Sequence, residues 1–222
     1  MIEINNIRKV YNAGVHNEYV ALDGVSCSLE AGKVTVFKGP SGSGKTTLLS
    51  VLGCMARPTS GRIVLSGRDI TSLPERFRTD VRRRTFGFIF QQFNLIKGIT
   101  ALENVMLPAY PFGERRASLE KRALLLFELF SITRRAREKA ELLSGGEIQR
   151  AAIARALIND PKAIIADEPT AHLDSSLSRD FMELVGRLKQ EGKTAIIASH
   201  DPIVYESGVV DRVISMRDGR IE

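Results

Sequence analysis

Hydrophobic residues form two kinds of pattern along the chain, and the first kind predicts strands. Continuous apolar runs at residues 163–166 and 195–198 are typical of strands that are covered on both faces in a parallel sheet. Shorter strands are expected in the first third of the chain, at residues 2–4, 20–29, 34–38 and 62–65, and a further core strand at 87–90. The pattern therefore predicts an α/β core.

The second kind of pattern is helical and fills the middle of the chain. Apolar residues recur there at helical spacing with Arg and Glu opposite, at Leu119, Ala123, Leu126, Phe127 and Phe130. A helix is expected to begin near Ser144 and to end at Pro161. No repeat or flexible linker divides the chain. We therefore predict one domain, with a helical lobe at 92–160 and the β portion and core at 1–91 and 161–222.

A glycine-rich segment follows the expected strand at 34–38 and precedes a helix-compatible stretch. It fits the pattern G-x-x-x-x-G-K-[ST] and comprises Gly39, Pro40, Ser41, Gly42, Ser43, Gly44, Lys45 and Thr46, with Thr47 next. Glycines at these positions let backbone N–H groups curl around phosphate oxygens, and the helix that follows offers its positive end. The segment predicts a triphosphate site in which Lys45 reaches the outer phosphates and Thr46 ligates Mg²⁺.

Two carboxylates, Asp167 and Glu168, follow the apolar run at 163–166. Carboxyl ends of buried strands are where α/β sheets bind ligands, so Asp167 is a candidate for the Mg²⁺ shell. Glu168 is then the candidate acceptor for the proton of the attacking water. An acidic pair before a proline is more often a surface turn, and the neighbouring phosphate motif reverses that expectation.

A third signal opens the helix expected near Ser144. Ser144 and Glu147 have the spacing of a capping box, which by itself explains both residues. Gly145 and Gly146 between them are unfavourable in a first helical turn unless something must approach the backbone closely. A phosphate at a helix N-terminus is such a partner.

Composition and charge restrict the class of protein further. The chain has 222 residues, 43% of them hydrophobic, and its apolar runs fall far short of the ~20 residues that cross a membrane. No apolar secretory stretch opens the sequence, so we expect a cytoplasmic protein with Cys27 and Cys54 as free thiols. The net charge is +6, and residues 57–139 hold seventeen basic residues against eight acidic ones. This basic segment indicates either a binding surface or an ordinary solvated face.

The order of these motifs resembles the nucleotide-binding subunit of ABC transporters over the whole chain. The matching segments are GPSGSGKTT at 39–47, Gln91 after GFIF, LSGGE at 143–147, IIADEPT at 164–170, Leu173-Asp174 and Ser199-His200. The stretches GFIFQQFNLI, TALENVMLP and LGCMARPTSG look most similar to ATPases of lipoprotein-releasing and macrolide-exporting systems. Glu147 stands where many family members have glutamine, and Ala171-His172-Leu173-Asp174 replaces a commoner loop with smaller residues.

The resemblance implies a role for each matching residue. Tyr11 would stack on adenine, with an ordinary strand-edge aromatic as the alternative, and His200 would contact the γ-phosphate. Gln91 would touch Mg²⁺ or the attacking water beside the membrane partner, and Gln92 competes for that assignment. The implied catalytic residues are thus Glu168, His200 and Gln91, and the metal ligands Thr46, Gln91 and Asp167. ATP contacts would come from Tyr11, residues 39–47, Ser144, Gly145, Gly146 and Asp174.

The resemblance also implies a fold and partners: an α/β P-loop NTPase with a RecA-like core, an N-terminal antiparallel β portion and a helical lobe. ATP and the LSGGE helix would meet from opposite subunits of a homodimer. A separate integral membrane permease would complete the transporter at the cytoplasmic face of the inner membrane, with no nucleic acid expected. The alternatives are a soluble ABC ATPase acting on DNA or ribosomes, which the run Arg82-Arg83-Arg84 motivates, and a nonhydrolytic tether, against which Glu168 argues.

Three apolar residues directly after the Gln91 segment, Phe93, Leu95 and Ile96, favour one further expectation. In a loop they would form an exposed docking surface for the membrane partner. The alternative is that they pack into the core of the helical lobe, as apolar residues near helix junctions usually do.

Overall fold

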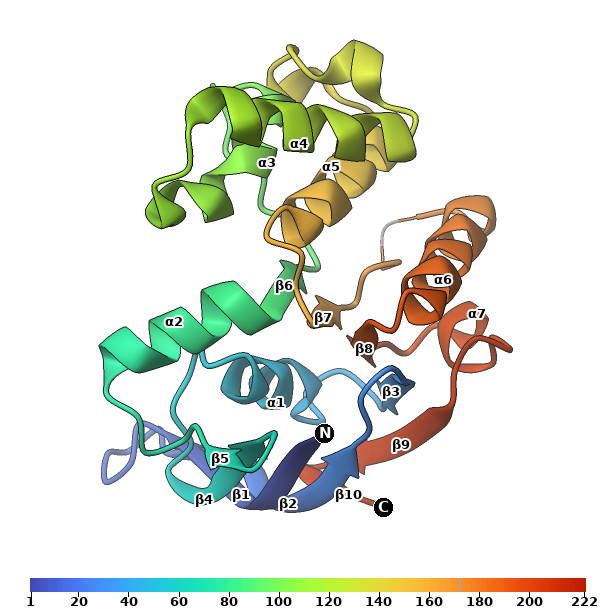
Figure 1. Cartoon of the computed structure of the whole chain (residues 1–222). Helices are drawn as coiled ribbons and strands as arrows, with labels where there is room; N and C mark the ends of the chain where they lie inside the picture. Colours follow the sequence, from blue (N-terminus) through green and yellow to red (C-terminus); the bar gives the residue numbers. More distant parts are fainter. Residues whose placement is uncertain (172) are drawn as a thin grey trace.

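The computed structural model describes residues 1–171 and 173–222 and contains two β-sheets. The first is antiparallel and four-stranded, in the order β2-β1-β4-β5. Its strands are β1 (Ile2–Tyr11), β2 (Tyr19–Leu29), β4 (Ser60–Leu65) and β5 (Arg68–Asp69). This sheet forms the base of the molecule as drawn in Figure 1. β1 is longer than its apolar start suggests because it pairs with both β2 and β4.

The second sheet has six strands in the order β10-β9-β3-β8-β7-β6. They are β3 (Val34–Lys38), β6 (Phe86–Ile89), β7 (Ala163–Asp167), β8 (Thr194–Ala198), β9 (Arg212–Arg217) and β10 (Arg220–Ile221). All pairings from β9 to β6 are parallel, and β10 adds an antiparallel edge. The apolar runs at 163–166 and 195–198 are adjacent central strands, β7 and β8, which confirms their prediction as buried parallel strands.

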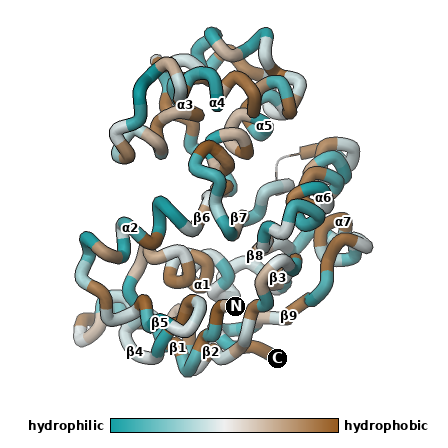
Figure 2. Tube along the Cα trace, viewed as in Figure 1, coloured by the Kyte–Doolittle hydropathy of each residue, from teal (hydrophilic) through white to brown (hydrophobic). Residues whose placement is uncertain are grey.

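Helix α1 (Lys45–Leu52) lies between the two sheets (Figure 1), and its second half is mainly hydrophobic (Figure 2). Leu48 and Leu52 of α1 are fully buried in one core with Ile4 of β1 and Ile196 of β8. Full burial of such a side chain contributes about 1.5–3 kcal/mol, so this core fixes the end of α1 relative to both sheets. The glycine-rich segment before α1 is therefore held on a rigid base.

A helical lobe stands above the six-stranded sheet (Figure 1). It contains α3 (Ala101–Met106), η1 (Leu107–Phe112), α4 (Arg116–Leu129), η2 (Thr133–Arg135), η3 (Ala140–Leu142) and α5 (Gly145–Leu157). Leu119, Ala123, Phe127 and Phe130 are buried in its core, and Leu126 packs against that core half-buried. The helical spacing in this stretch is thus confirmed, while the limits of the lobe at 92 and 160 stay a prediction.

Two helices differ from what the sequence predicts. Helix α5 ends at Leu157 and not at Pro161, because the chain turns there: the Asp160 N–H donates to the Leu157 carbonyl at 2.9 Å, and Asp160 has a φ of 47°. Helix α2 (Glu75–Thr85) was not predicted, since its eleven residues are mainly charged and show no apolar stripe. The remaining helices are α6 (Ser175–Gln190) and α7 (Pro202–Tyr205).

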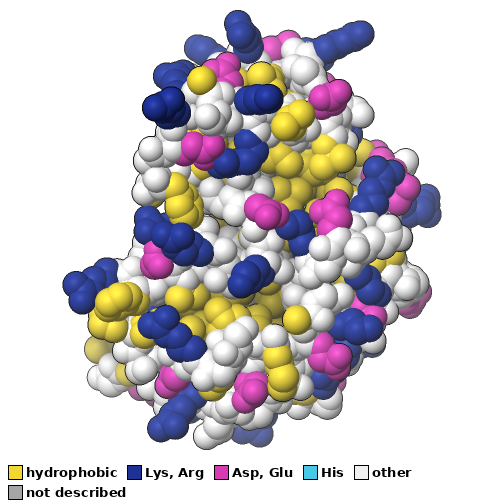
Figure 3. All heavy atoms as spheres, in the orientation of Figure 1, with side chains coloured by type: hydrophobic (Ala, Val, Ile, Leu, Met, Phe, Trp, Pro, Cys, Tyr) yellow, Lys and Arg dark blue, Asp and Glu magenta, His cyan; other side chains and the backbone are white. Residues whose placement is uncertain are grey.

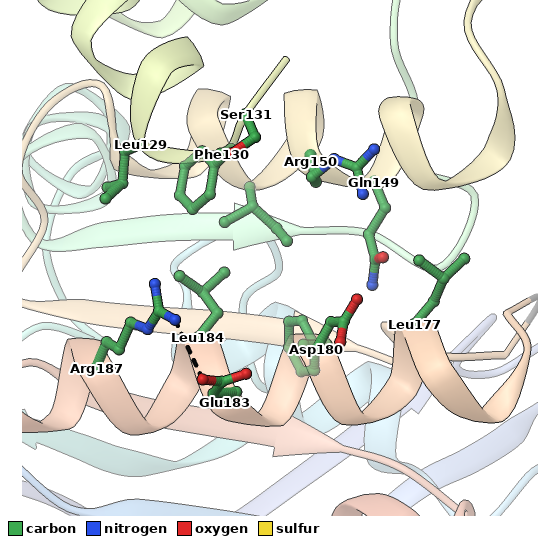
Figure 4. A pocket seen from close by; sticks show the side chains of 12 residues that line it. Leu129, Phe130, Ser131, Gln149, Arg150, Leu177, Asp180, Glu183, Leu184 and Arg187 are labelled. Atoms are coloured by element: carbon green, nitrogen blue, oxygen red, sulfur yellow. Dashed lines mark hydrogen bonds and ion pairs between the residues drawn. The ribbon is translucent and has the colours of Figure 1, made fainter.

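A groove separates the helical lobe from α6. It is lined by the end of α4, by α5 and by α6, and hydrophobic side chains gather in this hollow in Figure 3. Gln149 and Arg150 project from α5 over α6 in Figure 4. The Gln149 amide spans the gap and donates to the Pro169 carbonyl at 3.3 Å. Helix α5 therefore contacts the segment that follows β7. None of the helices in the described part of the chain is both long and apolar enough to span a membrane.

Candidate nucleotide-binding site

The glycine-rich segment joins β3 to α1, and two of its glycines permit close backbone contacts. A Cβ atom on Gly39 would lie 2.2 Å from the Met216 carbonyl oxygen of β9. Gly44 has a φ of 98°, and a Cβ there would lie 2.6 Å from the Ala21 carbonyl oxygen of β2. A side chain at either position would force the backbone apart, so the turn requires glycine. The sequence therefore folds into a tight loop directly before the N-terminus of α1.

Lys45 begins α1 and turns back over this loop. Its Nζ donates to the carbonyl oxygens of Gly39 at 2.7 Å and Pro40 at 3.0 Å, and lies 3.4 Å from Oε1 of Glu168. The hydroxyl of Ser43 is buried and has no hydrogen-bond partner among the described residues. A buried polar atom without a partner is unfavourable unless a ligand satisfies it. Together these groups fit a phosphate chain at the head of α1.

Thr46 and Asp167 meet beside this loop, from α1 and the end of β7. The Thr46 hydroxyl donates to Oδ1 of Asp167 at 3.1 Å. Burial raises the pKa of Asp167, and the Thr46 hydrogen bond offsets part of that effect. Hydroxyl and carboxylate oxygens are the ligands that Mg²⁺ prefers, and it takes the rest from waters and phosphate. The described residues contain no cluster of three or more His, Cys, Asp or Glu, so a protein-only metal cage is not built here.

Glu168 lies at the centre of the site with its side chain largely buried. Its Oε2 is 2.9 Å from Nδ1 of His200 and accepts from the His200 backbone N–H at 3.3 Å. Its φ of 44° falls in the left-handed region, which costs a non-glycine residue about 1–3 kcal/mol. The backbone is held there by the Glu168 N–H, which donates to the Ala198 carbonyl at 2.9 Å. This strain turns the carboxylate toward Lys45 and His200.

These residues line one cleft of about 300 Å³. The sequence segments that converge on it are far apart along the chain, and the lining comprises Tyr19, Ser41, Gly42, Ser43, Gly44, Lys45, Thr46, Thr47, Gln91, Glu168 and His200. Gly39 and Pro40 line a neighbouring hollow together with His200. Gln91, Glu168 and His200 follow β6, β7 and β8, three adjacent strands of the parallel sheet. The structure thus brings nearly all the predicted catalytic and phosphate-binding residues to one sheet edge.

Ser144, Gly145 and Gly146 lie outside this cleft, at the start of α5. Ser144 and Glu147 form the predicted capping box, in which the Ser144 N–H donates to Glu147 at 2.8 Å. This bond, followed by a hydrogen bond from Arg135, lowers the pKa of Glu147 to about 2. A Cβ on Gly145 would meet no atom within 4 Å. The N-terminus of α5 is therefore open on the Gly145 side, although it does not line the cleft of its own chain.

The ABC transporter family profile matches residues 22–171, more than half of the chain. The matched part contains the glycine-rich loop, the capping box and both carboxylates. The chain belongs to the ABC transporter family. An uncharacterized ABC transporter ATP-binding protein of Thermotoga maritima is 40% identical over 222 residues, which cover all of this chain and 94% of that protein.

Other relatives of this ABC cassette are either longer proteins that contain a similar segment or cassettes whose structures have been solved. The macrolide export ATP-binding/permease protein MacB of Hyphomonas neptunium is 42% identical over the whole cassette, which spans 34% of MacB. The cassette MJ0796 of Methanocaldococcus jannaschii was solved as a dimer in a post-hydrolysis state bound to ADP and Pi. It shares 39% identity with this chain and superposes with a TM-score of 0.92 over 100% of this chain and 97% of its own. The predicted P-loop fold and the prediction of an ATPase are thereby confirmed.

Tyr11, the expected adenine contact of the cassette, ends β1 directly opposite Tyr19 of β2. Tyr11 is 39% exposed, and Nζ of Lys9 lies 4.8 Å from the centre of its ring. Tyr19 lines the cleft, and its hydroxyl donates to the Gly42 carbonyl at 3.3 Å. The adenine role of Tyr11 stays a prediction. Tyr19 is a cleft residue that the sequence does not mark, because its position depends on the register between β1 and β2.

Asp174 caps the cassette's helix α6. Its Oδ1 accepts from the backbone N–H groups of Ser176 and Leu177, each at 2.9 Å. The carboxylate is therefore used as a helix cap and does not line the cleft of its own chain. His172, two residues before Asp174, lies outside the described residues.

The segment after β6 corrects one expectation. Gln91 lines the cleft and Gln92 does not, so the position of Gln91 favours it over Gln92. Phe93 is 8% exposed, and Leu95 packs half-buried against the core of the helical lobe. The expected exposure of all three apolar residues is therefore wrong: Ile96 alone of the three is exposed, at 52%. The reason is a turn that encloses Gln91 and Gln92, in which the Phe93 N–H donates to the Phe90 carbonyl at 2.8 Å.

The three arginines of the run on α2, Arg82 to Arg84, form contacts within the cassette. Arg83 and Arg84 both donate to Asp80, at 2.6 and 3.0 Å, and Arg82 donates to the Cys54 carbonyl at 2.7 Å. Both Arg83 and Arg84 also lie within about 5 Å of the Phe112 ring. Figure 3 shows several Lys and Arg side chains along the edge of the molecule where α2 lies in Figure 1. All three arginines of the run thus have partners in their own chain.

Proposed function

We propose that this cassette hydrolyses Mg-ATP to drive export or extraction of a substrate through a separate integral membrane permease. The observation that carries the proposal is the convergence of Lys45, Thr46, Glu168 and His200 on one cleft. Asp167 adjoins this cleft through its hydrogen bond with Thr46. We further propose that residues 92–160 act as a helical lobe on a core formed by 1–91 and 161–222. A peripheral position on the cytoplasmic face of the inner membrane follows from the proposed permease.

Each residue has a task that its position supports. Lys45 and the loop N–H groups hold the outer phosphates, and Ser43 offers its unpaired hydroxyl. Thr46 and Asp167, with the Gln91 amide oxygen, would hold Mg²⁺, which when bound neutralises charge on the β- and γ-phosphates. Glu168 accepts a proton from the attacking water. His200 is oriented by Glu168 at 2.9 Å and donates toward the γ-phosphate from its exposed face.

The second half of each site is proposed to come from a second copy of the chain. Ser144, Gly145 and Gly146 form a helix N-terminus that is open on the Gly145 side and does not reach the cleft of their own chain. A partner's phosphate at this end would satisfy the free N–H groups and explain the two glycines. Asp174, at the start of α6, is assigned to the same interface. The dimeric state of the MJ0796 relative supports this arrangement.

Mixing two inactive variants tests the shared site. Lys45→Ala removes the phosphate cradle, and Ser144→Asp retains a good helix cap while its charge repels a phosphate. Ser144→Asn is the matched control, because it caps the helix without charge. We expect each variant alone to lose most ATP turnover and their mixture to recover part of it, through heterodimers with one intact site. A mixture of proven heterodimers that stays as inactive as either parent would contradict site sharing.

The permease is tested by membrane association. The tagged chain, expressed in its own cells, should pellet with membranes, resist washing with 1 M salt and be released by detergent together with a polytopic membrane protein. Addition of that protein in nanodiscs should change the ATPase rate. Recovery of the chain with ribosomes or nucleic acid, in a form sensitive to nuclease, would instead support the alternative class of soluble ABC ATPase.

A further inference from the structure

The segment that follows Gln91 has an unusual backbone. Phe93 and Asn94 are consecutive residues in the left-handed region, with φ values of 56° and 48°. Such a conformation costs a non-glycine residue about 1–2 kcal/mol, so two in succession need support from their surroundings. The Phe93 N–H donates to the Phe90 carbonyl at 2.8 Å, which closes a tight turn around Gln91 and Gln92. The direction in which Gln91 leaves β6 therefore depends on what holds this turn.

Arg155 holds the turn from the helical lobe. Its guanidinium donates to the carbonyl oxygen of Asn94 at 2.6 Å through Nη1, and to that of Phe93 through Nη2. Burial lowers the pKa of Arg155, and these two carbonyls are the acceptors that compensate its desolvation. The planar guanidinium presents two parallel donors, so it fixes both carbonyls of the left-handed pair at once. A lysine ammonium is a point charge and cannot reproduce this fork.

A second contact ties the same segment to the lobe. Asn104 of α3 is fully buried, and its side chain forms two hydrogen bonds with the backbone of Ile96. The Ile96 N–H donates to Oδ1 at 2.6 Å, and Nδ2 donates to the Ile96 carbonyl at 3.0 Å. Residues 93–96 are thus bound to α5 and α3, whereas Gln91, two residues earlier, lines the nucleotide cleft in the core. The segment is a short link between lobe and cleft.

We propose that Arg155 is a positioning residue for ATP hydrolysis, which fixes the left-handed turn at Phe93 and Asn94 and thereby holds the Gln91 amide in the cleft. The inference rests on the proposed role of Gln91. Arg155 lies near the C-terminal end of α5, and Ser144 caps the other end of this 13-residue helix, about 16 Å away. A displacement of α5 by a phosphate at its N-terminus is therefore passed to Gln91 through the Arg155 guanidinium.

The first test is hydrogen–deuterium exchange on the full chain without nucleotide. Arg155→Met removes the fork and keeps an unbranched apolar stem, so amides of residues 92–96 should exchange at least about tenfold faster. Amides of residues 39–47 should be unchanged. Arg212→Met is the matched control, because Arg212 also donates to a backbone carbonyl, that of Ser28 in β2 at 2.9 Å, and β9 lies far from β6 in the sheet order. Unchanged exchange at 92–96 in a folded Arg155→Met protein would overturn the proposal.

The second test is a double-mutant cycle on ATP turnover. Arg155→Met should lower kcat about tenfold and change the KM for ATP less than threefold, because the phosphate cradle is untouched. Arg155→Lys should lie between Arg155→Met and the parent, and it replaces the Met variant if that protein does not fold. In the Gln91→Ala background, loss of Arg155 should have almost no further effect on kcat.

The outcomes separate two failures. Normal turnover of the Gln91→Ala protein would show that Gln91 has no role in hydrolysis. The proposal that Arg155 positions Gln91 for hydrolysis would then fail as well. A slow Gln91→Ala protein that becomes a further tenfold slower without Arg155 retains the role of Gln91. In that case Arg155 acts independently of Gln91, and the positioning proposal is wrong.

Discussion

Replacing Glu168 by glutamine changes one oxygen to an amide group at the centre of the cleft. The carboxylate is 2.9 Å from Nδ1 of His200 and 3.4 Å from Nζ of Lys45. The glutamine carbonyl can still accept from the His200 backbone N–H, so the left-handed turn at residue 168 keeps one of its restraints. Lys45 keeps the Gly39 and Pro40 carbonyls as acceptors. We therefore expect a folded protein with an almost unchanged cleft.

The expected kinetic effect follows from the lost proton acceptor. A positioned general base contributes roughly 10²–10⁴-fold to a rate, which corresponds to about 3–5 kcal/mol of transition-state stabilisation. ATP affinity should rise, because the change removes a negative charge beside the phosphates and leaves Lys45 free to bind them. The Glu168→Gln protein should consequently bind ATP, turn over at least about a hundredfold slower than the parent, and accumulate as an ATP-dependent dimer.

The measurement is single-turnover hydrolysis at saturating Mg-ATP, combined with gel filtration in ATP and in ADP. Glu183→Gln serves as the matched control, since that carboxylate pairs with Arg187 on the surface of α6 at 3.1 Å. The control should hydrolyse ATP like the parent. Equal rates for the Glu168→Gln protein and the parent would refute the assignment of Glu168 as the proton acceptor. A protein that loses ATP binding would instead show that Glu168 shapes the phosphate site.

Three further predictions concern the phosphate-binding loop, the capping box of α5 and the residues that contact adenine. Gly44→Ala should abolish ATP binding and lower the melting temperature, because its Cβ would lie 2.6 Å from a carbonyl oxygen at a φ of 98°; normal nucleotide binding would contradict this. Glu147→Gln should lower the free energy of unfolding by about 1 kcal/mol at pH 7, a value that allows for screening by solvent, and should leave it unchanged near pH 2. The folded-state pKa of about 2 lies below the ordinary value of 4.5, so the stabilisation is complete above pH 5 and is lost as the pH falls toward 2, which denaturant titrations at pH 7 and pH 2 would measure. Tyr11→Ala should weaken ATP binding in a fluorescent-nucleotide titration; if Tyr19→Ala weakens it and Tyr11→Ala does not, adenine lies against Tyr19.

The parts of the fold that could be predicted are those in which one local signal dominates. The runs at 163–166 and 195–198 are apolar at every position because β7 and β8 are covered on both faces. Helix α2 lacks such a signal, since its mainly charged residues are stabilised by ion pairs such as Arg78–Glu75 at 2.9 Å. The burial of Phe93 could not be predicted for a related reason. It depends on a left-handed backbone at Phe93 and Asn94, which the local sequence does not indicate.

The candidate site shows the same division. The phosphate loop and the acidic pair could be located because glycines and carboxylates at fixed spacing have few other uses in a strand–loop–helix context. Arg155 could have been noticed as a cation within the otherwise apolar stretch Ala151–Ile158. Its partners could not, because they are backbone carbonyls some sixty residues earlier in the chain. Pairings of that kind depend on tertiary packing and not on local pattern.

The place of β3 in the sheet has a consequence for how the protein forms during synthesis. β3 leads into the phosphate loop, yet its two neighbours are β8 and β9. At the start of β3 the Gly32 N–H is bound by the Thr194 hydroxyl, 162 residues further along the chain. β3 lacks both partner strands until the ribosome has released β8, and lacks one until it has released β9. Long-range parallel pairing is also slow to form. Nascent chains should therefore gain ATP affinity abruptly and late, so that an incomplete cassette cannot consume nucleotide.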